Sequence, residues 1–293
     1  MKIKDLEYYL QLVESKNFSI VAEKFNVRQP TITMAIRRLE EEYGTTFFIR
    51  DRVHHQVQVT ETGLQFTNHV RTILNELAIS RQEIEHTKKN KVLFGLPPII
   101  GNYYFPAVTP RLLQANLLDR LVTVEHGSKE LLQMLLSGKL DMALLGSLSS
   151  FKEARLRTVE FACYPFKIIM GTNHPLAQES QVSFADLKGQ SFILPDTDFI
   201  HDQAFRQMCR SAHFRPKVIY RTNDIHIIKA MVEEGMGISF LAELAIDPSD
   251  RFTSLEMMED YQPYFHLSLA TRQTEFLSPV KQKLWETIRA IGK

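Results

Sequence analysis

Residues 28–44 have the sequence Arg-Gln-Pro-Thr-Ile-Thr-Met-Ala-Ile-Arg-Arg-Leu-Glu-Glu-Glu-Tyr-Gly, and this stretch decides the fold of the N-terminal part of the chain. Proline in the first turn and glycine after the last turn are typical of a helix, which we predict from Gln29 to Tyr43, ended by Gly44. The apolar residues share one face, within an arc of about 100°: Ile32, Ala35, Ile36, Leu39 and Tyr43. The other side carries the polar row Gln29, Thr33 and Arg37, with Pro30, Met34 and Arg38 beside it.

Two shorter helices precede this one. Residues 5–14 form one apolar helical face through Leu6, Tyr9, Leu10 and Val13. A second helix is predicted to begin with Ser19 as its N-cap and to end near Phe25. Three short helices with an outward polar row fit two alternatives. One is a small helical domain whose polar face meets water, and the other is a helix-turn-helix that hydrogen-bonds base edges and phosphates.

A predicted β-hairpin favours the second alternative. Its strands are residues 47–50 and 57–60, around a polar tip at residues 51–56. Such a wing would bring Arg50 and Arg52 to the DNA backbone, and we interpret the histidines at its tip as solvated, since no Cys or carboxylate cluster accompanies them. The net charge of +1 does not by itself indicate a nucleic-acid partner. Basic residues nevertheless cluster locally, at Lys24, Arg28, Arg37 and Arg38 and at Arg50 and Arg52.

One pattern in residues 17–63 is specific: Asn17-Phe18-Ser19, Ala22, Arg28-Gln29-Pro30-Thr31-Ile32-Thr33, Ile36, Leu39-Glu40, Gly44, Phe48-Ile49-Arg50 and Thr60-Glu61-Thr62-Gly63. It closely resembles the DNA-binding head of LysR-type transcription regulators, in which a Gln-Pro-x-x-Ser/Thr segment opens the recognition helix. The resemblance implies DNA contacts from Ser19, Arg28, Gln29, Pro30, Thr31, Thr33, Arg37, Arg38, Arg50 and Arg52. Of these, Gln29, Pro30, Thr33 and Arg37 would lie near bases, and Ser19, Arg50 and Arg52 near phosphates. Arg28 and Thr33 stand where the family usually has Ser, which affects the preferred DNA sequence rather than DNA binding itself.

Residues 61–90 contain no Pro, and no Gly after Gly63, and predict one long helix. A heptad seam runs along it through Phe66, Val70, Ile73, Leu77, Ser80 and Ile84. Such a stripe needs a partner, either a second copy of the helix or the protein's own domain. The family uses this helix to dimerise. The resemblance therefore implies a homodimer or homotetramer that reads two half-sites of double-stranded promoter DNA, with RNA polymerase as a further partner.

From residue 91 the pattern changes to alternating strands and helices. We predict strands at residues 92–96, 121–125, 140–145, 166–171, 191–194, 217–221 and 237–242. Helices are predicted at residues 103–115 and 128–137, the second with Ser128 as N-cap and Gly138 after its end. The β-α-β-α-β order predicts a parallel sheet with helices on its faces. Crossings between two lobes at residues 163–165 and 261–264 divide this region into subdomain I, 91–161 plus 268–293, and subdomain II, 162–267.

Motifs of the C-terminal region carry the same resemblance: Gly127-Ser128, Gly138-Lys139-Leu140-Asp141-Met142-Ala143-Leu144, His174-Pro175-Leu176-Ala177, Asp186-Leu187-Lys188-Gly189 and Val232-Glu233-Glu234-Gly235-Met236-Gly237-Ile238. They are similar to the effector domain of LysR-type regulators. The implied protein is of the α/β class. It has a winged helix-turn-helix domain (1–60), a linker and dimerisation helix (61–90) and a two-lobed, periplasmic-binding-protein-like effector-binding domain (91–293).

Ligands of such domains bind where strands end and helices begin. Pro98 and Pro195 occupy such places, and the effector contacts predicted there are Ile99, Ile100, Gly127, Ser128, Gly146, Ser147, Asp196, Thr197, Phe199, His201, Asn223 and Asp224. Helix capping is an equal alternative for each of them. A carboxylate would suit helix N-terminal amides with Ser128 and Thr197, and His201 could add positive charge at mild acidity. Asp196 would accept a ligand hydroxyl or cap a helix.

Other classes of protein fit the sequence less well. There is no G-x-S-x-G, HExxH, CxxC or phosphate-loop motif, so we predict no enzyme, cofactor or metal site. An exported solute-binding protein would need a signal segment, but Asp5, Glu7 and Glu14 interrupt the start of the chain. With two cysteines and no run of eighteen apolar residues, the chain is expected in the cytoplasm.

A finer resemblance concerns the effector. Residues 3–9, Ile-Lys-Asp-Leu-Glu-Tyr-Tyr, and residues 29–33, Gln-Pro-Thr-Ile-Thr, resemble the regulators of malolactic systems in lactic-acid bacteria. That resemblance implies a small carboxylate, L-malate, as the effector.

Overall fold

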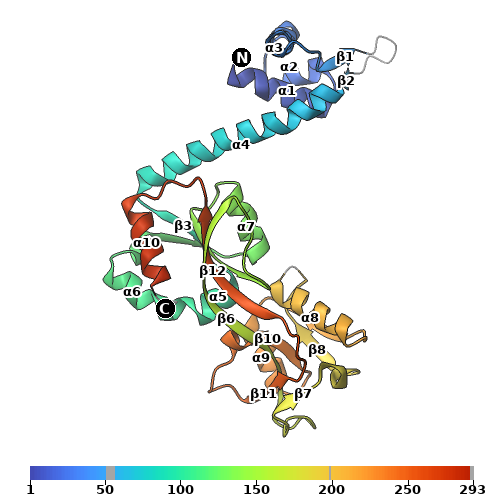
Figure 1. Cartoon of the computed structure of the whole chain (residues 1–293), viewed down its shortest axis with the longest axis vertical. Coiled ribbons are helices and arrows are strands. Elements are labelled where there is room, and N and C mark those ends of the chain that lie inside the picture. Colours follow the sequence, from blue (N-terminus) through green and yellow to red (C-terminus); the bar gives the residue numbers. More distant parts are fainter. Residues whose placement is uncertain (51–56, 198, 291–293) are drawn as a thin grey trace. The chain divides into compact units, whose positions relative to one another are not determined.

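The chain forms two units that divide inside one long helix, α4 (Glu61–Lys89). A computed structural model describes residues 1–50, 57–197 and 199–290, with the backbone alone at residues 50, 86, 87 and 89 (Figure 1). The first unit is Met1–Gln82 and the second is Glu83–Lys293, so the last turns of α4 belong to the second unit. The single long helix predicted after residue 60 is confirmed, whereas the division into domains at residues 60 and 90 stays a prediction.

The head consists of three helices and a two-stranded sheet: α1 (Ile3–Ser15), α2 (Phe18–Lys24), α3 (Gln29–Tyr43), β1 (Phe48–Arg50) and β2 (Val57–Val59). The two strands pair antiparallel, as a wing requires, and the wing tip with Arg52 lies outside the described residues. The predicted apolar face of α3 is buried at Ile32, Ala35, Ile36 and Leu39. Tyr43, by contrast, is half exposed and rests against the rings of Phe47 and Phe66.

Asn17, rather than the predicted Ser19, is the N-cap of α2. Its side-chain oxygen accepts hydrogen bonds from the backbone N–H groups of Ser19 (2.8 Å) and Ile20 (3.2 Å). Asn17 has an extended backbone, the conformation from which an Asn side chain reaches back over the first helical turn. Ser19 therefore lies exposed within the first turn of α2.

The apolar seam predicted along α4 divides between two roles. Phe66 and Val70 are buried in the core of the head, so docking against the protein's own domain is correct for this half of the seam. Ile73 and Ile84 are exposed, and Ile79, which lies outside the predicted seam, is buried. Heptad spacing gives the period of an apolar stripe but does not show which surface covers each position.

The second unit is an α/β structure with two lobes that share the long strand β6 (Leu156–Gly171). The first lobe contains β3 (Val92–Gly95), α5 (Pro98–Tyr103), α6 (Phe105–Gln114), β4 (Leu121–Val124), α7 (Ser128–Leu136), β5 (Met142–Ser147), β12 (Tyr264–Arg272) and α10 (Pro279–Arg289). The second contains β7 (Gln181–Val182), β8 (Ser191–Leu194), α8 (Ile200–Ser211), β9 (Lys217–Arg221), α9 (Ile225–Glu233), β10 (Ser239–Ala242) and β11 (Phe252–Met257). Short 3-10 turns lie at Leu118–Arg120, Phe184–Leu187 and Glu243–Ala245.

The main sheet is mixed, with the strand order β4-β3-β5-β12-β6-β11-β7 and β10 paired to β6. β3 pairs parallel with β4 and β5, so the parallel pairing predicted from the β-α-β-α-β order is correct for these three strands. The sheet as a whole is mixed, because β12, a strand that was not predicted, pairs antiparallel with β5 and β6. The physical reason is the path of the chain, because β12 returns to the first lobe only after the chain has passed through the whole second lobe. Local alternation of strands and helices does not reveal such a long-range pairing.

Strand β6 changes partners along its length. Leu156 to Pro165 pair with β12, whereas Phe166 to Gly171 pair with β10 and β11 of the second lobe. Figure 1 shows β6 and β12 running together at the junction of the lobes. Two antiparallel strands therefore connect the lobes, and the junction lies where Pro165 pairs with Tyr264.

Candidate DNA interface and ligand pocket

The first turns of α3 present an exposed polar surface. Arg28, Gln29, Pro30 and Thr31 are all exposed, and Arg37 follows two turns later with 70% of its side chain exposed. Thr33 is half-buried between them. The buried face of α3 anchors this row against the core of the head, so the row is held on a rigid helix. Its amide, hydroxyl and guanidinium groups are those that read base edges in the major groove.

Arg37 and Arg38 have different environments although they are neighbours. Arg37 forms an exposed i,i+4 ion pair with Glu41 (2.8 Å), a kind of pair that contributes little to stability. Arg38 instead bonds Asp5 on α1 (2.5 Å), whose carboxylate is 1% exposed. Burial opposes ionisation of Asp5, but hydrogen bonds from Arg38 and the Lys2 N–H hold its pKa below its ordinary value. Arg38 thus joins α3 to α1.

This difference leads to a stability prediction. We expect Arg38→Ala to destabilise the head by about 2 kcal/mol, because the buried carboxylate of Asp5 loses its charged partner. Arg37→Ala is the matched control and should stay within about 0.5 kcal/mol of the unsubstituted protein. Urea unfolding of both variants, followed by helical circular dichroism, measures the difference. Equal unfolding midpoints for the two variants would contradict the structural role of Arg38.

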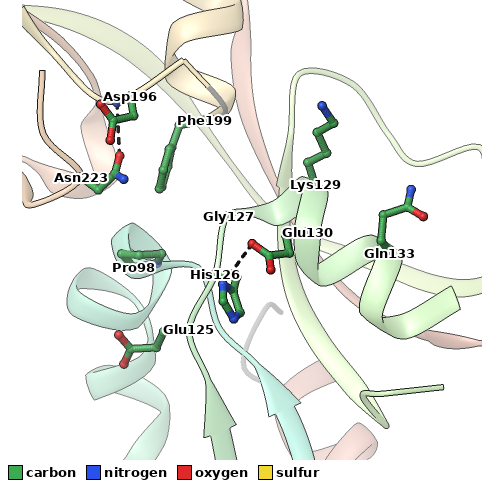
Figure 2. Close-up of a pocket in the computed structure, with 10 residues that line it drawn as sticks. All are labelled: Pro98, Glu125, His126, Gly127, Lys129, Glu130, Gln133, Asp196, Phe199 and Asn223. Carbon is green, nitrogen blue, oxygen red and sulfur yellow. Dashed lines mark hydrogen bonds and ion pairs between the residues drawn. The ribbon is translucent and has the colours of Figure 1, made fainter. Parts of the chain in front are cut away.

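A pocket of about 540 Å³ lies between the lobes of the second unit (Figure 2). Its lining residues come from both lobes: Pro98, Glu125, His126, Gly127, Lys129, Glu130 and Gln133 from the first, and Asp196, Phe199 and Asn223 from the second. The backbone N–H of Asp196 donates to Asn223 Oδ1 (3.2 Å), which ties together the two loops of the second lobe. The shape of the pocket therefore depends on the arrangement of the two lobes.

Several residues predicted as effector contacts line this pocket. Gly127, Asp196, Phe199 and Asn223 do so, and Pro98 lies beside them at the start of α5. Whether they contact an effector stays a prediction.

Other predicted effector contacts have structural partners. The hydroxyl of Ser128 accepts the Gly146 N–H (2.8 Å), and Gly127, not the predicted Ser128, is the N-cap of α7. Ser147 donates to the Ser149 carbonyl, and Asp224 caps α9 by accepting the His226 N–H. Ile99 and Ile100 are buried in the core, and Thr197 is exposed outside the lining. Gly146 has a packing role, because a Cβ there would lie 2.3 Å from the ring of Phe265.

The prediction that His201 supplies positive charge at mild acidity is wrong. Its side chain is 2% exposed and lies between the rings of Phe166 (5.2 Å) and Phe265 (5.1 Å). Burial lowers the pKa of the imidazole to about 3, so the ring is neutral at mild acidity. Sequence position at a helix start gave no sign that this side chain turns into the core.

Sequence reasoning missed the charged side chains on the first-lobe wall. Glu125, His126, Lys129, Glu130 and Gln133 follow the edge strand β4 and continue along α7. Residues 126, 129, 130 and 133 have the i, i+3, i+4 and i+7 spacing of one helical face, which is the signal that could have found them. His126 Nδ1 lies 3.0 Å from Glu130 Oε2, so these two side chains form a pair across the start of α7.

The pocket combines both signs of charge. Glu125, Glu130 and Asp196 supply carboxylates, and Lys129 supplies an ammonium group. Gly127 and Phe199, the N-caps of α7 and α8, make no side-chain capping bond, and the first turns of both helices begin beside the pocket. The described residues contain no cluster of His, Cys, Asp or Glu suited to a metal ion.

The fold and these two surfaces define a class of protein in which a winged helix-turn-helix is carried with a two-lobed, ligand-binding domain. Residues 3–64 match the bacterial regulatory helix-turn-helix protein family, lysR type, and residues 86–292 match the LysR substrate binding domain. The chain belongs to the LysR family of bacterial transcription regulators. The prediction of a regulator rather than an enzyme is thereby confirmed.

Similar proteins cover the whole chain. The malolactic fermentation system transcriptional activator of Lactococcus lactis is 32% identical over 99% of both chains. The DNA-binding transcriptional dual regulator OxyR of Escherichia coli is 29% identical, over 99% of this chain and 95% of that one. A full-length OxyR variant from Pseudomonas aeruginosa has the same fold, with a TM-score of 0.58 and 21% identity over 100% of both chains. No helix in the described ranges has the length and apolar character needed to cross a membrane.

Proposed function

We propose that this regulator binds promoter DNA as a dimer through the start of α3, and that a small hydroxycarboxylate in the interlobe pocket changes this binding. The observation that carries the proposal is the exposed polar row on α3, set opposite a buried apolar face, on the same chain as a polar pocket between two lobes. A regulator of this kind acts on the chromosome, which assigns it to the cytoplasm.

The DNA contacts that we propose follow from exposure. Gln29, Pro30, Thr33 and Arg37 read bases, while Ser19, Arg28 and Thr31 position the phosphates. Arg50 and Arg52 are proposed as phosphate contacts from the family resemblance, because the side chain of Arg50 and the whole of Arg52 lie outside the described part of the chain. Arg38 is left out of the base contacts because its guanidinium is bound to Asp5. Dimerisation through α4 is supported by the exposed apolar residues Leu64, Ile73 and Ile84 on that helix. A dimer places two heads on two half-sites; tetramer formation and contact with RNA polymerase rest on the family alone.

The chemistry of the pocket supports a ligand that carries both a carboxylate and a hydroxyl. Lys129 and the helix starts at Gly127 and Phe199 suit the carboxylate. Glu125 and Asp196 are hydrogen-bond acceptors, so they suit a hydroxyl that donates. L-malate has these groups, and the relative named for malolactic fermentation supports it as the first candidate.

The test uses the full-length protein and a duplex that carries the DNA upstream of its own gene. We expect L-malate to change the DNase footprint, and succinate, which lacks the hydroxyl, to bind at least about tenfold more weakly. Lys129→Gln should raise the Kd for L-malate by about tenfold or more, because a charged hydrogen bond is lost. Lys139→Gln, an exposed lysine outside the lining, is the matched control and should bind L-malate normally.

Two results would overturn different parts of the proposal. Weak, sequence-independent binding to the upstream duplex at moderate salt would refute the DNA interface on α3. Normal DNA binding that no concentration of L-malate alters would refute this effector while leaving the DNA interface intact.

A further inference from the structure

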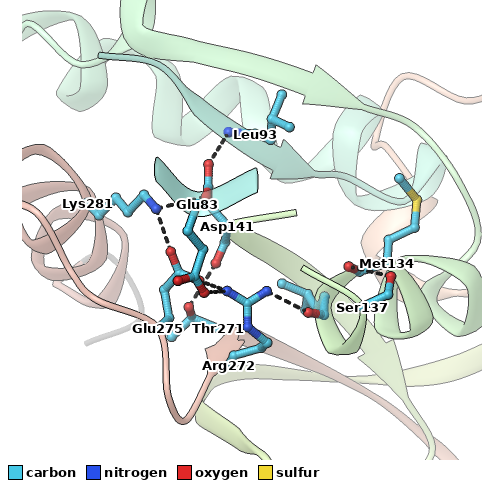
Figure 3. Close-up of polar contacts among 10 residues, drawn as sticks. Glu83, Leu93, Met134, Ser137, Asp141, Thr271, Arg272, Glu275 and Lys281 are labelled. Atoms are coloured by element: carbon cyan, nitrogen blue, oxygen red, sulfur yellow. Dashed lines mark hydrogen bonds and ion pairs between the residues drawn. The ribbon is translucent and has the colours of Figure 1, made fainter. Parts of the chain in front are cut away.

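A buried network of charged side chains joins the end of α4 to the first lobe (Figure 3). Lys281 on α10 donates to Asp141 (2.8 Å) and to Glu275 (2.5 Å). Arg272, the last residue of β12, forms ion pairs with both Glu275 and Glu83. Except for Glu83, all of these side chains are buried, so their charges are stabilised by one another and not by water.

Among the described residues, the network contains more carboxylates than cations. Its described members are three carboxylates, from Glu83, Asp141 and Glu275, and two cations, from Arg272 and Lys281. Burial raises the pKa of Glu275 to about 7, although its bonds to Lys281 and Arg272 favour the charged form of the carboxyl. Glu83, whose side chain is 25% exposed, is the least buried of the described members of the network.

Glu83 also has a special place on α4. It is the first residue of the second unit, and the described side chains that follow it on the helix, Ile84, Glu85 and Lys88, are exposed. The ion pair with Arg272 thus holds the last turns of α4 to the first lobe. α4 is one continuous helix over Glu61–Lys89, so Glu83 lies on the same helix that continues into the first unit.

The other end of β12 lies near the pocket. Phe265, its second residue, contacts the ring of His201 in the first turn of α8 (5.1 Å) and packs against Gly146. Phe199, the N-cap of α8, lines the pocket. From the lobe junction β12 runs nine residues to Arg272, a length of about 30 Å for a strand. Two neighbouring strands pair with it along this length, so it moves as a stiff element.

We propose that Arg272 and Glu83 are positioning residues that transmit the state of the interlobe pocket, through strand β12, to the linker helix α4. The inference rests on the proposed function, because it assumes that a pocket ligand alters DNA binding. A ligand that moves the start of α8 displaces Phe265, and the displacement reaches Arg272 along β12. The pairing of Arg272 with Glu83 then sets the direction of α4.

The test compares Glu83→Gln with Glu85→Gln in the full-length protein. Both changes remove one carboxylate from α4, but Glu85 is exposed and pairs with Lys88 on the same helix. We expect Glu83→Gln to bind L-malate within twofold of the unsubstituted Kd while its footprint no longer changes with L-malate. Hydrogen exchange at the backbone amides of residues 84–88 should rise at least tenfold in Glu83→Gln without ligand. Glu85→Gln should behave normally in all three measurements.

Each outcome decides the inference. A Glu83→Gln variant that still changes its footprint with L-malate overturns it, and so does one that loses L-malate binding, since the residue would then serve pocket stability. If L-malate does not change the footprint of the unsubstituted protein, L-malate is not the effector. The role of the Glu83–Arg272 ion pair is then tested by hydrogen exchange alone. Equal exchange in the two variants then overturns the inference, whereas a selective rise in Glu83→Gln supports it.

Discussion

Lys281→Ala is expected to destabilise the effector domain by about 3–5 kcal/mol at neutral pH. The side chain of Lys281 is 2% exposed, and its ammonium group is bonded to both Asp141 and Glu275. Alanine would remove the ammonium group that both of these buried carboxylates bond. Thermal and urea unfolding, followed by the near-ultraviolet signal of Trp285, measure the loss, because this tryptophan is buried on the same helix.

The loss should be smaller at pH 5 than at pH 8. Burial already raises the pKa of Glu275 to about 7, and removal of the ammonium group of Lys281 raises it further. Below that pKa the carboxyl of Glu275 binds a proton in the folded state and loses its charge, so part of the penalty disappears as the pH falls. Lys283→Ala, two residues along α10 and exposed, is the matched control. A loss below about 1 kcal/mol in Lys281→Ala, or one independent of pH, contradicts this account.

Gln29→Ala and Arg37→Ala are each expected to weaken binding to the cognate operator by about 1–3 kcal/mol and to relax its sequence preference. Both side chains are exposed on the outer face of α3, and neither is needed by the core of the head. Fluorescence anisotropy with the operator and with single-base variants at fixed salt measures both effects.

Arg155→Ala is the control for Arg37→Ala. The two arginines have the same exposure, 70%, and each pairs with a nearby glutamate, but Arg155 lies in the effector domain. Its replacement should leave operator affinity unchanged. If Arg37→Ala binds all sequences with one uniform loss, it contacts phosphate rather than bases.

Local signals predicted the head well. The apolar period of residues 32–39, proline at the helix start and glycine at its end all act within a few residues, and the structure has α3 over Gln29–Tyr43. Ser19 was assigned as a cap because Ser suits that position, but Asn17 competes for the same amides and reaches them. The sequence did not show that Arg38 is bound within the head, because its partner Asp5 lies 33 residues away in the chain.

The sequence predicted the pocket less completely, because local signals do not show which side chains from distant parts of the chain come together. Strand ends and helix starts located Gly127, Asp196, Phe199 and Asn223, which line it. A strand end does not show where a side chain points, however, and His201 turned inward to Phe166 and Phe265. The antiparallel strand β12 could not be placed because its partners, β5 and β6, lie more than a hundred residues earlier in the chain.

The sequence by itself determined the class of protein, the helices and wing of the head, the long helix α4 and the α/β character of the remainder, since these follow from periodicity and short motifs. Only the tertiary structure decided the mixed sheet, the charged wall of the pocket and the network from Lys281 to Glu83. The mixed sheet and the network depend on residues that are distant in the chain meeting in space, and the charged wall at residues 125–133 becomes part of a pocket only opposite Asp196, Phe199 and Asn223. The burial and the charge pairing of these side chains arise only in the folded protein, once those residues are in contact.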